Sequence, residues 1–449
     1  MAFKNEQSAA NPLAIRRIIL EKLFGVYSYS IPAVDSAREN ESYSQLLMLY
    51  GDNGSGKTTI LRLVFHLLSP EDRKGHRTFL AETIFRRFEV ELANGINVSA
   101  SRHNEKLVGT YELAISMGHE IMAKCTCVTN EGLHIVESKG LDNFLQCLRQ
   151  LDLAIYFLAD DRKIARSVSP ERTREEELML RRRIVLAGYA EESEESRQDV
   201  NVKNAVQRVT QWIRQQVLKG ASIGQDNSNT IYAHVVKQIV SEKTASTLDG
   251  KATSASMINT IEELAARNNL YAEYGLVAPM NAQSFATPLR AAQKGSSQLM
   301  TRILQPYFDG ITARLDALEG IYRLVRLFVT NINSFYTGKC AQFSLQTGLA
   351  ISSSSGTRLK LNMLSSGEKQ LLLLFCNTLI ARDRSAIFII DEPELSLNVK
   401  WQRRLVKALL DCIEGSNIQF LLATHSLEIL ALHRNNVAKL VNASPEEGR

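Results

Sequence analysis

One stretch constrains the fold of this chain more than any other, the run Gly51-Asp52-Asn53-Gly54-Ser55-Gly56-Lys57-Thr58-Thr59. A glycine, four residues and then Gly-Lys-Thr have the spacing of a phosphate-binding loop, whose backbone N–H groups surround an anion. The apolar run 46–50 before it predicts a buried strand, and the run 60–65 after it predicts a helix whose N-terminus faces the same anion. In this arrangement Lys57 would reach the β- and γ-phosphates of a nucleotide and Thr58 would bind Mg²⁺. The alternative is an ordinary glycine-rich turn, and the full motif between a strand and a helix argues against it.

The composition is that of a folded globular protein, with 45% hydrophobic and 22% charged residues among 449. The net charge of +5 permits contact with nucleic acid without arguing for it. The six cysteines form no CxxC pair, so neither a zinc knuckle nor a disulfide framework is indicated. The N-terminus lacks a signal-peptide pattern, and the longest apolar run, near residues 371–376, is too short to cross a bilayer. We therefore expect a cytoplasmic protein with reduced thiols and no membrane partner.

Strand patterns surround the phosphate-binding loop. Runs rich in β-branched and aromatic residues predict antiparallel strands at 15–20, 26–31, 85–92, 96–100, 110–115 and 121–128, the middle two joined by a turn at Asn94-Gly95. The apolar runs 153–158, 385–390 and 418–423 predict buried strands that lie parallel to the strand 46–50. The short runs 343–345 and 358–361 also have strand character. Together these segments predict an α/β fold with a parallel core sheet and an antiparallel β region.

Residues 163–340 have helical periodicity and are too numerous for a simple connection, which predicts an inserted helical domain. Breaks at Gly188, 221–224 and 248–250 divide it into several helices. The charge runs 171–183 and 191–195 are interpreted as solvated faces, with phosphate contact by residues 181–183 as the alternative. Apolar positions that share a helix face are Val202, Val206, Val209, Ile213 and Val217, and on another helix Leu299, Ile303, Tyr307, Ile311, Leu315, Leu318 and Tyr322.

Polar side chains suited to ATP hydrolysis follow two of the predicted parallel strands. Asp391 and Glu392 come directly after the run 385–390, and His425 follows the run 418–423. Hydrolysis needs a carboxylate that anchors Mg²⁺ and a second group that orients the attacking water, roles that suit Asp391 and Glu392. Adjacent acids at a strand end are often only part of a turn. Their occurrence in one chain with a phosphate-binding loop favours the catalytic interpretation.

A further motif is the segment Leu364-Ser365-Ser366-Gly367-Glu368-Lys369-Gln370, which precedes an apolar run. Ser365 and Glu368 have the spacing of a capping box, which would simply begin a buried helix. A serine-rich helix N-terminus is also an anion site, which could bind the γ-phosphate of a nucleotide held elsewhere. Both interpretations use the same geometry, and the residues alone leave them open.

In their order along the chain, these four motifs resemble the Walker A, signature, Walker B and switch-histidine motifs of ABC-type ATPases. The forms Ser-Ser-Gly-Glu-Lys-Gln and Asp-Glu-Pro-Glu resemble the branch that contains the SMC proteins, the OLD nucleases and many anti-phage ATPases. The resemblance implies an ABC ATPase head formed by residues 1–162 and 341–449. The insertion at 163–340 would then serve oligomerisation or the binding of a partner or trigger.

The resemblance also implies ATP and Mg²⁺ as cofactors and two protomers that enclose the nucleotide. Ser366 and Gly367 of one protomer would cap the γ-phosphate bound at Lys57 of the other, Glu392 would be the general base or water-orienting residue, and His425 would contact the γ-phosphate. The implied metal ligands include Thr58 and Asp391. The implied nucleotide-contacting residues are Gly51, Asp52, Asn53, Gly54, Ser55, Gly56, Lys57, Thr58, Thr59, Ser365, Ser366, Gly367 and Glu368.

Two positions depart from the family pattern. The glutamine expected after the strand 153–158 is not evident, and Asp160 and Asp161 stand there instead as further candidate metal ligands. Asn398 stands where histidine is common in this branch, so the resemblance leaves its role open.

Three functional classes compete. By length and layout the chain resembles most the ATPase component (AriA) of PARIS-type anti-phage defence systems, followed by the Septu ATPase (PtuA). That resemblance implies an ATP-dependent sensor or scaffold that assembles as ATP-sandwich dimers or larger homo-oligomers and responds to a phage-derived trigger protein. An SMC-like DNA-repair ATPase is the alternative, with DNA as a candidate ligand. A transporter ATPase subunit is the least favoured class.

We expect the damaging chemistry of such a system to reside in a separate effector protein, a nuclease encoded nearby. Only 449 − 425 = 24 residues follow His425, too few for a folding domain. The insertion contains a single histidine, His234, and no recognisable nuclease constellation.

Overall fold

The computed structural model describes residues 11–32, 44–72, 74–103, 106–158, 164–167, 199–220, 254–291, 294–395 and 397–442. It divides into two compact units, one formed by Met1–Gln198 with Asn377–Arg449 and the other by Asp199–Cys376. The predicted helix breaks at Gly188, 221–224 and 248–250, the charge runs between 171 and 195, and Asp160 and Asp161 lie outside the described residues.

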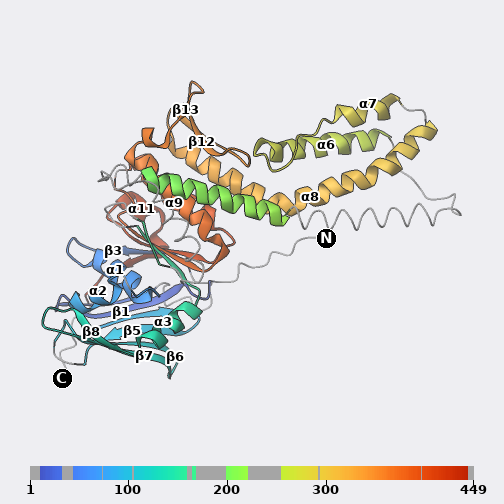
Figure 1. Cartoon of the computed structure of the whole chain (residues 1–449). Helices are drawn as coiled ribbons and strands as arrows, with labels where there is room; N and C mark the ends of the chain where they lie inside the picture. Colours follow the sequence, from blue (N-terminus) through green and yellow to red (C-terminus); the bar gives the residue numbers. More distant parts are fainter. Residues whose placement is uncertain are drawn as a thin grey trace, which may run out of the picture. The chain divides into compact units, whose positions relative to one another are not determined.

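An antiparallel sheet forms one layer of the first unit (Figure 1). Alternation along its strands buries one face, as in β5, where Ile96, Val98 and Ala100 point into the core. The antiparallel strands predicted on either side of the phosphate-binding loop are confirmed. In sheet order the strands are β2 (Tyr27–Pro32), β1 (Ile15–Leu23), β4 (Arg87–Leu92), β5 (Ile96–Ser101), β6 (Tyr111–Met117), β7 (Glu120–Thr129) and β8 (Ile135–Lys139).

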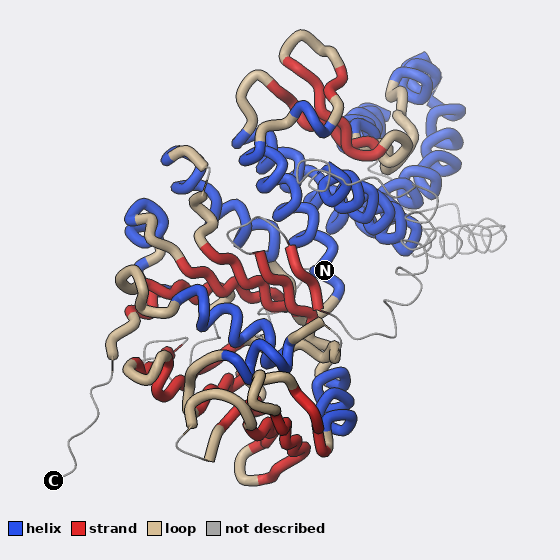
Figure 2. The backbone as a smooth tube through the Cα atoms, turned by 60° about the vertical axis from the view of Figure 1, so that its left-hand side comes forward, coloured by secondary structure: helices blue, strands red, loops and turns tan. Residues whose placement is uncertain are grey.

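A second, mostly parallel sheet lies in the same unit, and both sheets are drawn in red in Figure 2. Its strands in order are β10 (Ile164–Ser167), β9 (Ala154–Leu158), β14 (Ala386–Asp391), β15 (Ile418–Ala423), β3 (Leu46–Tyr50) and β16 (Val437–Lys439). Every residue of β9, β14 and β15 is buried, which explains why these strands are almost entirely apolar. The predicted α/β fold class, with a parallel core sheet and an antiparallel β region, is confirmed.

The edge strand β10 corrects one expectation. Helical character was predicted from residue 163 onward, yet residues 164–167 pair with β9 as an antiparallel strand. The edge of β9 offers unpaired backbone groups, and β10 satisfies them by extending the hydrogen-bond ladder.

Helix α1 (Lys57–Leu68) lies between the two sheets of the first unit. It contacts β9, β14 and β15 of the parallel sheet and β5 of the antiparallel sheet. Because both of its sides face a sheet, most of its residues are apolar, and Ile60, Leu61, Leu63 and Val64 are all fully buried. Each such side chain contributes about 1.5–3 kcal/mol of burial free energy, so the helix that follows the phosphate-binding loop is part of the core.

A buried amide connects the two sheets. Gln419 on β15 is 1% exposed, and its Oε1 accepts the backbone N–H of Ile15 on β1 at 2.7 Å. Its Nε2 donates to the carbonyls of Ile15 and Ser44, both at 3.1 Å. The amide therefore satisfies backbone groups where a strand partner is missing.

The remaining helices of the first unit cover the sheets. Helix α2 (His76–Glu82) packs on α1 and β8, and α3 (Leu141–Gln150) packs on β6 and β7. Helices α10 (Val399–Ile413) and α11 (Leu427–Leu432) contact each other. Short 3₁₀ turns, η3 (Ala381–Asp383) and η4 (Arg434–Asn436), complete the described part of this unit.

The second unit is mainly helical. It contains a helix over residues 199–220, α6 (Ser254–Glu273), α7 (Gln283–Ala291) and the long α8 (Lys294–Phe335), with α6 and α7 lying along part of α8 (Figure 1). Tyr271 of α6 and Tyr322 of α8 stack with ring centroids 4.2 Å apart. The predicted apolar face of residues 199–220 is confirmed, because Val202, Val206, Val209, Ile213 and Val217 are all buried.

The predicted apolar face of α8 is confirmed only in its second half. Leu315, Leu318 and Tyr322 are buried, but Tyr307 is 41% exposed. Its ring centroid lies 5.7 Å from that of Phe285 on α7, so one side of the ring is covered while the rest meets solvent. The side chains of Leu299 and Ile303 lie outside the described set.

A three-stranded antiparallel sheet follows α8. It consists of β11 (Lys339–Ser344), β12 (Gly348–Ser353) and β13 (Arg358–Leu359), and β11 packs on α8. The 3₁₀ turn η2 (Leu361–Met363) then leads to α9 (Ser366–Ile380), the helix predicted after the capping box.

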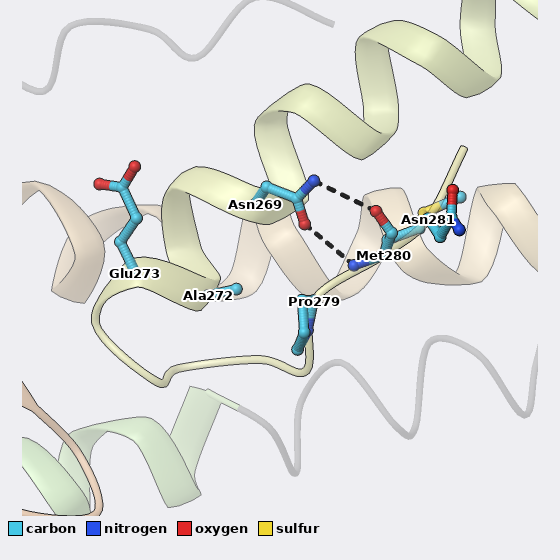
Figure 3. A pocket seen from close by; sticks show the side chains of 6 residues that line it. All are labelled: Asn269, Ala272, Glu273, Pro279, Met280 and Asn281. Carbon is cyan, nitrogen blue, oxygen red and sulfur yellow. Dashed lines mark hydrogen bonds between the residues drawn. The ribbon is translucent and has the colours of Figure 1, made fainter. Parts of the chain in front are cut away.

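The connection between α6 and α7 forms a small surface pocket lined by Asn269, Ala272, Glu273, Pro279, Met280 and Asn281 (Figure 3). The side chain of Asn269 holds this connection in place. Its Oδ1 accepts the N–H of Met280 at 2.9 Å and its Nδ2 donates to the Met280 carbonyl at 3.1 Å. Because backbone groups occupy both ends of the amide, we assign the pocket a structural role.

Candidate nucleotide-binding site

The phosphate-binding loop has the predicted strand–loop–helix form, with β3 ending at Tyr50 and α1 beginning at Lys57. Gly56 has φ +88°, in the left-handed region that favours glycine. A Cβ atom at this position would lie 2.5 Å from Cδ2 of Leu23. Gly56 is therefore required both by backbone conformation and by space.

The side chain of Lys57 folds back onto the start of the phosphate-binding loop. It is 6% exposed, and its Nζ donates hydrogen bonds to the carbonyls of Gly51 and Asp52, each at 2.9 Å. Burial lowers the pKa of Lys57, while the nearby carboxylates, chiefly Glu392 and Asp391, oppose that shift. The ammonium group thus lies within electrostatic range of the acidic motif, as expected if both act on one nucleotide.

The loop offers groups that fit a phosphate. The hydroxyl Oγ of Ser55 is buried without a hydrogen-bond partner in the described structure, while the Ser55 carbonyl accepts the hydroxyl of Tyr29 at 2.9 Å. Gly56 is the N-cap residue of α1, and no side chain caps this helix N-terminus. Unsatisfied donors at a helix N-terminus beside a buried lysine are the features of an anion site, so ATP fits this loop.

The acidic motif lies at the end of β14, which is separated from β3 by β15 in the sheet. Asp391, the last residue of β14, is 4% exposed, and Glu392 follows with φ +46°, an unusual left-handed conformation for a residue with a side chain. The N–H of Glu392 donates to the carbonyl of Ala423 at 2.9 Å, which anchors the turn to β15. Strained backbone of this kind often occurs at functional sites.

Glu392 faces the predicted switch histidine. Its Oε1 lies 3.9 Å from Nε2 of His425, and both side chains are about one-third exposed. The two groups follow β14 and β15, which are adjacent in the sheet, and β3 lies on the other side of β15. The structure therefore brings Lys57, Asp391, Glu392 and His425 to the carboxyl edge of three neighbouring strands, where parallel α/β sheets bind ligands.

Glu394, which sequence reasoning left without a role, fixes the histidine loop. Its Oε1 accepts hydrogen bonds from Thr424 Oγ1 at 2.7 Å, from the N–H of His425 at 2.7 Å and from the N–H of Ser426 at 3.0 Å. The Asp-Glu-Pro-Glu motif contains this residue, but its partners lie thirty residues away in sequence. Only the pairing of β14 with β15 reveals them.

The segment after the acidic motif is tied to the same loop. Gln402 accepts the hydroxyl of Ser426 at 2.8 Å and donates to the Leu397 carbonyl at 2.9 Å. Asn398, at the position that departs from the family pattern, caps α10 by accepting the N–H of Trp401 at 3.0 Å. An asparagine there starts the helix, which explains its presence without a catalytic role.

Phe24 is a second residue that the sequence analysis missed. It lies in the turn between β1 and β2 with φ +54°, and its N–H donates to the Ile84 carbonyl at 2.9 Å. Its side chain is 43% exposed, and a Cβ at Gly56 would lie 3.3 Å from its ring atom Cε2. The sequence feature that could have drawn attention to Phe24 is an aromatic residue in a tight turn that precedes the phosphate-binding loop.

The signature motif belongs to the second unit, and its capping box is confirmed. The N–H of Ser365 donates to Glu368 Oε2 at 2.7 Å, and the N–H of Glu368 donates to Ser365 Oγ at 3.3 Å. Lys339 also donates to Glu368 Oε2, at 2.6 Å. This geometry confirms the structural interpretation and leaves contact with a γ-phosphate as a prediction.

Of the four predicted metal ligands, the structure describes two. Asp391 and Thr58 lie at the phosphate-binding edge, whereas Asp160 and Asp161 are outside the described ranges. In the part of the chain that is described, no cluster of three His, Cys, Asp or Glu residues could hold a metal ion alone. Mg²⁺ usually binds one or two carboxylates together with waters and substrate phosphates, so Thr58 and Asp391 fit it in the presence of a nucleotide.

A protein-family model described as "AAA domain, putative AbiEii toxin, Type IV TA system" matches residues 285–431, which include the signature, Asp391, Glu392 and His425. Together with the geometry of the phosphate-binding loop, this match supports an ATPase domain. No curated protein matches the chain.

Three solved structures of SMC heads are similar over most of the chain. One, from Pyrococcus furiosus, carries an extended coiled coil bound to the C-terminal domain of ScpA, with 12% identity, TM-score 0.37 and 95% coverage of both chains. A second SMC head, bound to the C-winged helix domain of ScpA, has 13% identity and TM-score 0.36, covering 96% of this chain and 98% of the other. A third, with a coiled coil and joint from Pyrococcus yayanosii, has 11% identity and TM-score 0.35, covering 95% and 96%. Similarity at these levels says nothing about shared function.

Among the described residues, no helix is both long and apolar enough to span a membrane.

Proposed function

We propose that this protein binds and hydrolyses ATP. The observation that carries the proposal is the meeting of Lys57, Asp391, Glu392 and His425 at the ends of β3, β14 and β15 within one unit. A buried lysine in a phosphate-binding loop, a buried carboxylate and an exposed carboxylate–imidazole pair are the groups that phosphoryl transfer to water requires.

Each of these residues has a distinct task. Lys57 and the loop amides bind phosphate oxygens, with the ammonium exchanging the carbonyls of Gly51 and Asp52 for the anion. Thr58 and Asp391 hold Mg²⁺. When bound, ATP and Mg²⁺ supply the phosphoryl group and the charge that stabilises its transfer. Glu392 orients a water and takes up its proton, and His425 donates to the phosphate that Lys57 holds.

We further propose that a second copy completes the site. The signature motif presents the N-terminus of α9 with Ser366 and Gly367 at its start, and such an N-terminus suits an anion. Its proposed ligand is the γ-phosphate held by Lys57 of the other copy. ATP binding would therefore stabilise a homodimer, which larger assemblies would repeat.

The biological role we propose is that of a sensor or scaffold in bacterial anti-phage defence, of the PARIS type. In this role ATP-dependent assembly restrains a separate effector nuclease, and a phage protein shifts the assembly towards release by binding one state more tightly than the other. The resemblance of the motifs supports this role, and so does the family description, which refers to a toxin of a type IV TA system.

The second candidate function is that of an SMC-like ATPase that acts on DNA. The observation in its favour is α8, a continuous helix of 42 residues that spans about 63 Å at 1.5 Å per residue. Salt-dependent, ATP-stimulated binding of duplex DNA by the purified chain would favour this function.

The defence role is tested by expressing the chain with its neighbouring genes and purifying it with and without ATP. The proposal expects a nuclease from a neighbouring gene to co-purify, and expects the chain alone to leave DNA and RNA intact with Mg²⁺ or Mn²⁺. Glu392→Gln, which should bind ATP and hydrolyse it slowly, shows whether co-purification depends on ATP binding or on ATP turnover. Nucleic-acid cleavage that survives stringent purification and disappears on substitution within this chain would refute the separate effector.

A further inference from the structure

The carboxylate of Glu368 lies in the first turn of α9 and is nearly enclosed. The residue is 6% exposed, and its Oε2 is shared by the N–H of Ser365 at 2.7 Å and the ammonium of Lys339 at 2.6 Å. The Lys339 side chain is itself only 22% exposed. The two residues therefore form a largely buried ion pair directly at the start of the signature helix.

The ion pair keeps Glu368 ionised. Burial raises the pKa of Glu368, but the hydrogen bonds from Lys339 and Ser365 outweigh it and hold the pKa below the ordinary value. The N-terminus of a helix carries a partial charge of about +0.5. A full negative charge in the first turn therefore more than cancels the attraction that the helix end would have for an anion.

The neighbouring cation on α9 does not compensate this charge. Lys369, the next residue of α9, is bound to Asp199 at 2.7 Å, so its charge is already balanced. Among the described lysines and arginines, Lys339 is the one that forms an ion pair with Glu368, and it balances the Glu368 charge. With Lys339 in place, the net potential at the helix start returns to that of the helix dipole.

We propose that Lys339 is a positioning residue for ATP-dependent assembly: by neutralising Glu368, it keeps the N-terminus of α9 attractive to the γ-phosphate held by a second copy. Lys339 touches no nucleotide in this account and acts through Glu368. The inference rests on the proposed composite ATP site.

The surroundings of Lys339 keep its ammonium in place. It is the first residue of β11, directly after α8. Close by, the hydroxyl of Tyr336 donates to the Glu368 carbonyl at 3.4 Å, and the ring of Phe335 lies 5.7 Å from that of Phe375 on α9. The ion pair is thus held by packing between the end of α8 and the start of α9.

A purely structural ion pair and a charge-neutralising one differ in their response to a second substitution. If Lys339 only stabilised the fold, its loss would weaken the dimer whether or not Glu368 carried a charge. If Lys339 neutralises Glu368, it becomes dispensable once that charge is removed. Glu368→Gln removes the charge, and glutamine at this position still closes a capping box.

The test measures the ATP-dependent dimer dissociation constant by analytical ultracentrifugation, with Glu392→Gln in every protein so that ATP persists. Lys339→Gln is compared with its parent in the presence of Glu368, and again in the E368Q background. We expect Lys339→Gln to weaken the dimer by at least about tenfold in the first comparison and by less than about twofold in the second. Lys339→Arg, which keeps the charge, should restore most of the loss.

Lys407→Gln is the matched control, since Lys407 forms an exposed pair with Asp411 on α10. It should leave the dimer constant unchanged. If Lys339→Gln has no effect, or weakens the dimer equally in both backgrounds, the inference is wrong while the composite site stands. If the parent binds ATP but forms no ATP-dependent dimer, the composite site itself is wrong and the inference with it. Should Lys339→Gln fail to fold in the presence of Glu368, as judged by circular dichroism, the ion pair serves the fold and not the assembly, and the inference is overturned.

Discussion

Oε1 of Glu394 accepts the backbone N–H of His425 at 2.7 Å, which ties the last residue of the acidic motif to the residue that faces Glu392. The same oxygen accepts donors from Thr424 and Ser426, so one carboxylate holds three consecutive residues of the histidine loop. The position of the imidazole relative to Glu392 therefore depends on a residue that contacts neither nucleotide nor metal in the proposed mechanism.

Replacing Glu394 should disturb catalysis more than binding. Glu394→Ala removes three hydrogen bonds to a charged group and frees the histidine loop, so we expect kcat for ATP to fall at least about tenfold. Glu394→Gln keeps an acceptor and should lose less. ATP affinity should change little, because Lys57 is untouched. The control is Glu428→Ala, whose carboxylate forms an exposed pair with Arg403. A Glu394→Ala protein with turnover within about twofold of wild type would contradict the role of this carboxylate.

Lys57 and Glu392 should separate binding from chemistry. Lys57 contacts phosphate in the ground state, so Lys57→Ala should abolish measurable ATP binding. Glu392 acts on the water only as the reaction proceeds, so Glu392→Gln should bind ATP normally and turn it over at least about 10²-fold more slowly. Equilibrium binding of a fluorescent ATP analogue and single-turnover hydrolysis measure the two effects. Near-normal turnover by Glu392→Gln would mean that another group activates the water.

Phe24 should affect the apparent affinity for ATP. Its exposed ring lies beside Gly56, where it offers a flat surface for the base of a nucleotide. Stacking of a base on an aromatic ring contributes about 1–3 kcal/mol, so Phe24→Ala should raise KM for ATP by about tenfold with little change in kcat. Phe24→Tyr should preserve KM. Val26→Ala, a substitution of an exposed residue in the same turn, is the control. Unchanged KM in Phe24→Ala would place the base elsewhere.

Acid should destabilise the first unit through His66 and His76, whose Nδ1 atoms lie 2.9 Å apart. Burial first, and then nearby cationic groups, lower the pKa of His66 to about 3 and that of His76 to about 4. Both histidines therefore stay neutral in the folded protein, whereas the unfolded chain takes up protons below about pH 6.5. The free energy of unfolding should fall by about 1.4 kcal/mol per pH unit for each histidine between pH 6 and pH 5.

Urea unfolding at pH 7.5, 6 and 5 measures this slope. His76→Gln should make the decline shallower by about half, and the exposed His119→Gln should leave it unchanged. A stability that is flat across this range in the wild-type protein would contradict the burial of the pair as neutral imidazoles.

The sequence predicts best where a motif and its local structure coincide. The strand, loop and helix around Lys57 follow from spacing and apolar periodicity, and the capping box of Ser365 and Glu368 follows from a local rule. The partners of Glu394 could not be predicted, because they depend on which strands pair. Phe24 was missed because its role depends on a turn that brings it to Gly56. Tyr307 fits the helical period but is half exposed, since α7 covers only one side of it.

The central claim is that two copies of this chain form each ATPase site, and mixing two inactive variants tests it most directly. Ser366→Arg should block the signature helix of its own copy, and Lys57→Ala should empty the loop of its own copy, so each protein alone should be inactive. A mixed dimer retains one site with an intact Lys57 from one copy and an intact Ser366 from the other. We predict that mixing under exchange conditions restores ATP hydrolysis to about one quarter of the wild-type rate, as expected if half of the dimers are mixed and each carries one of two sites. Complete absence of hydrolysis in the mixture, with both variants folded and Ser366→Arg still binding ATP, would contradict the shared site.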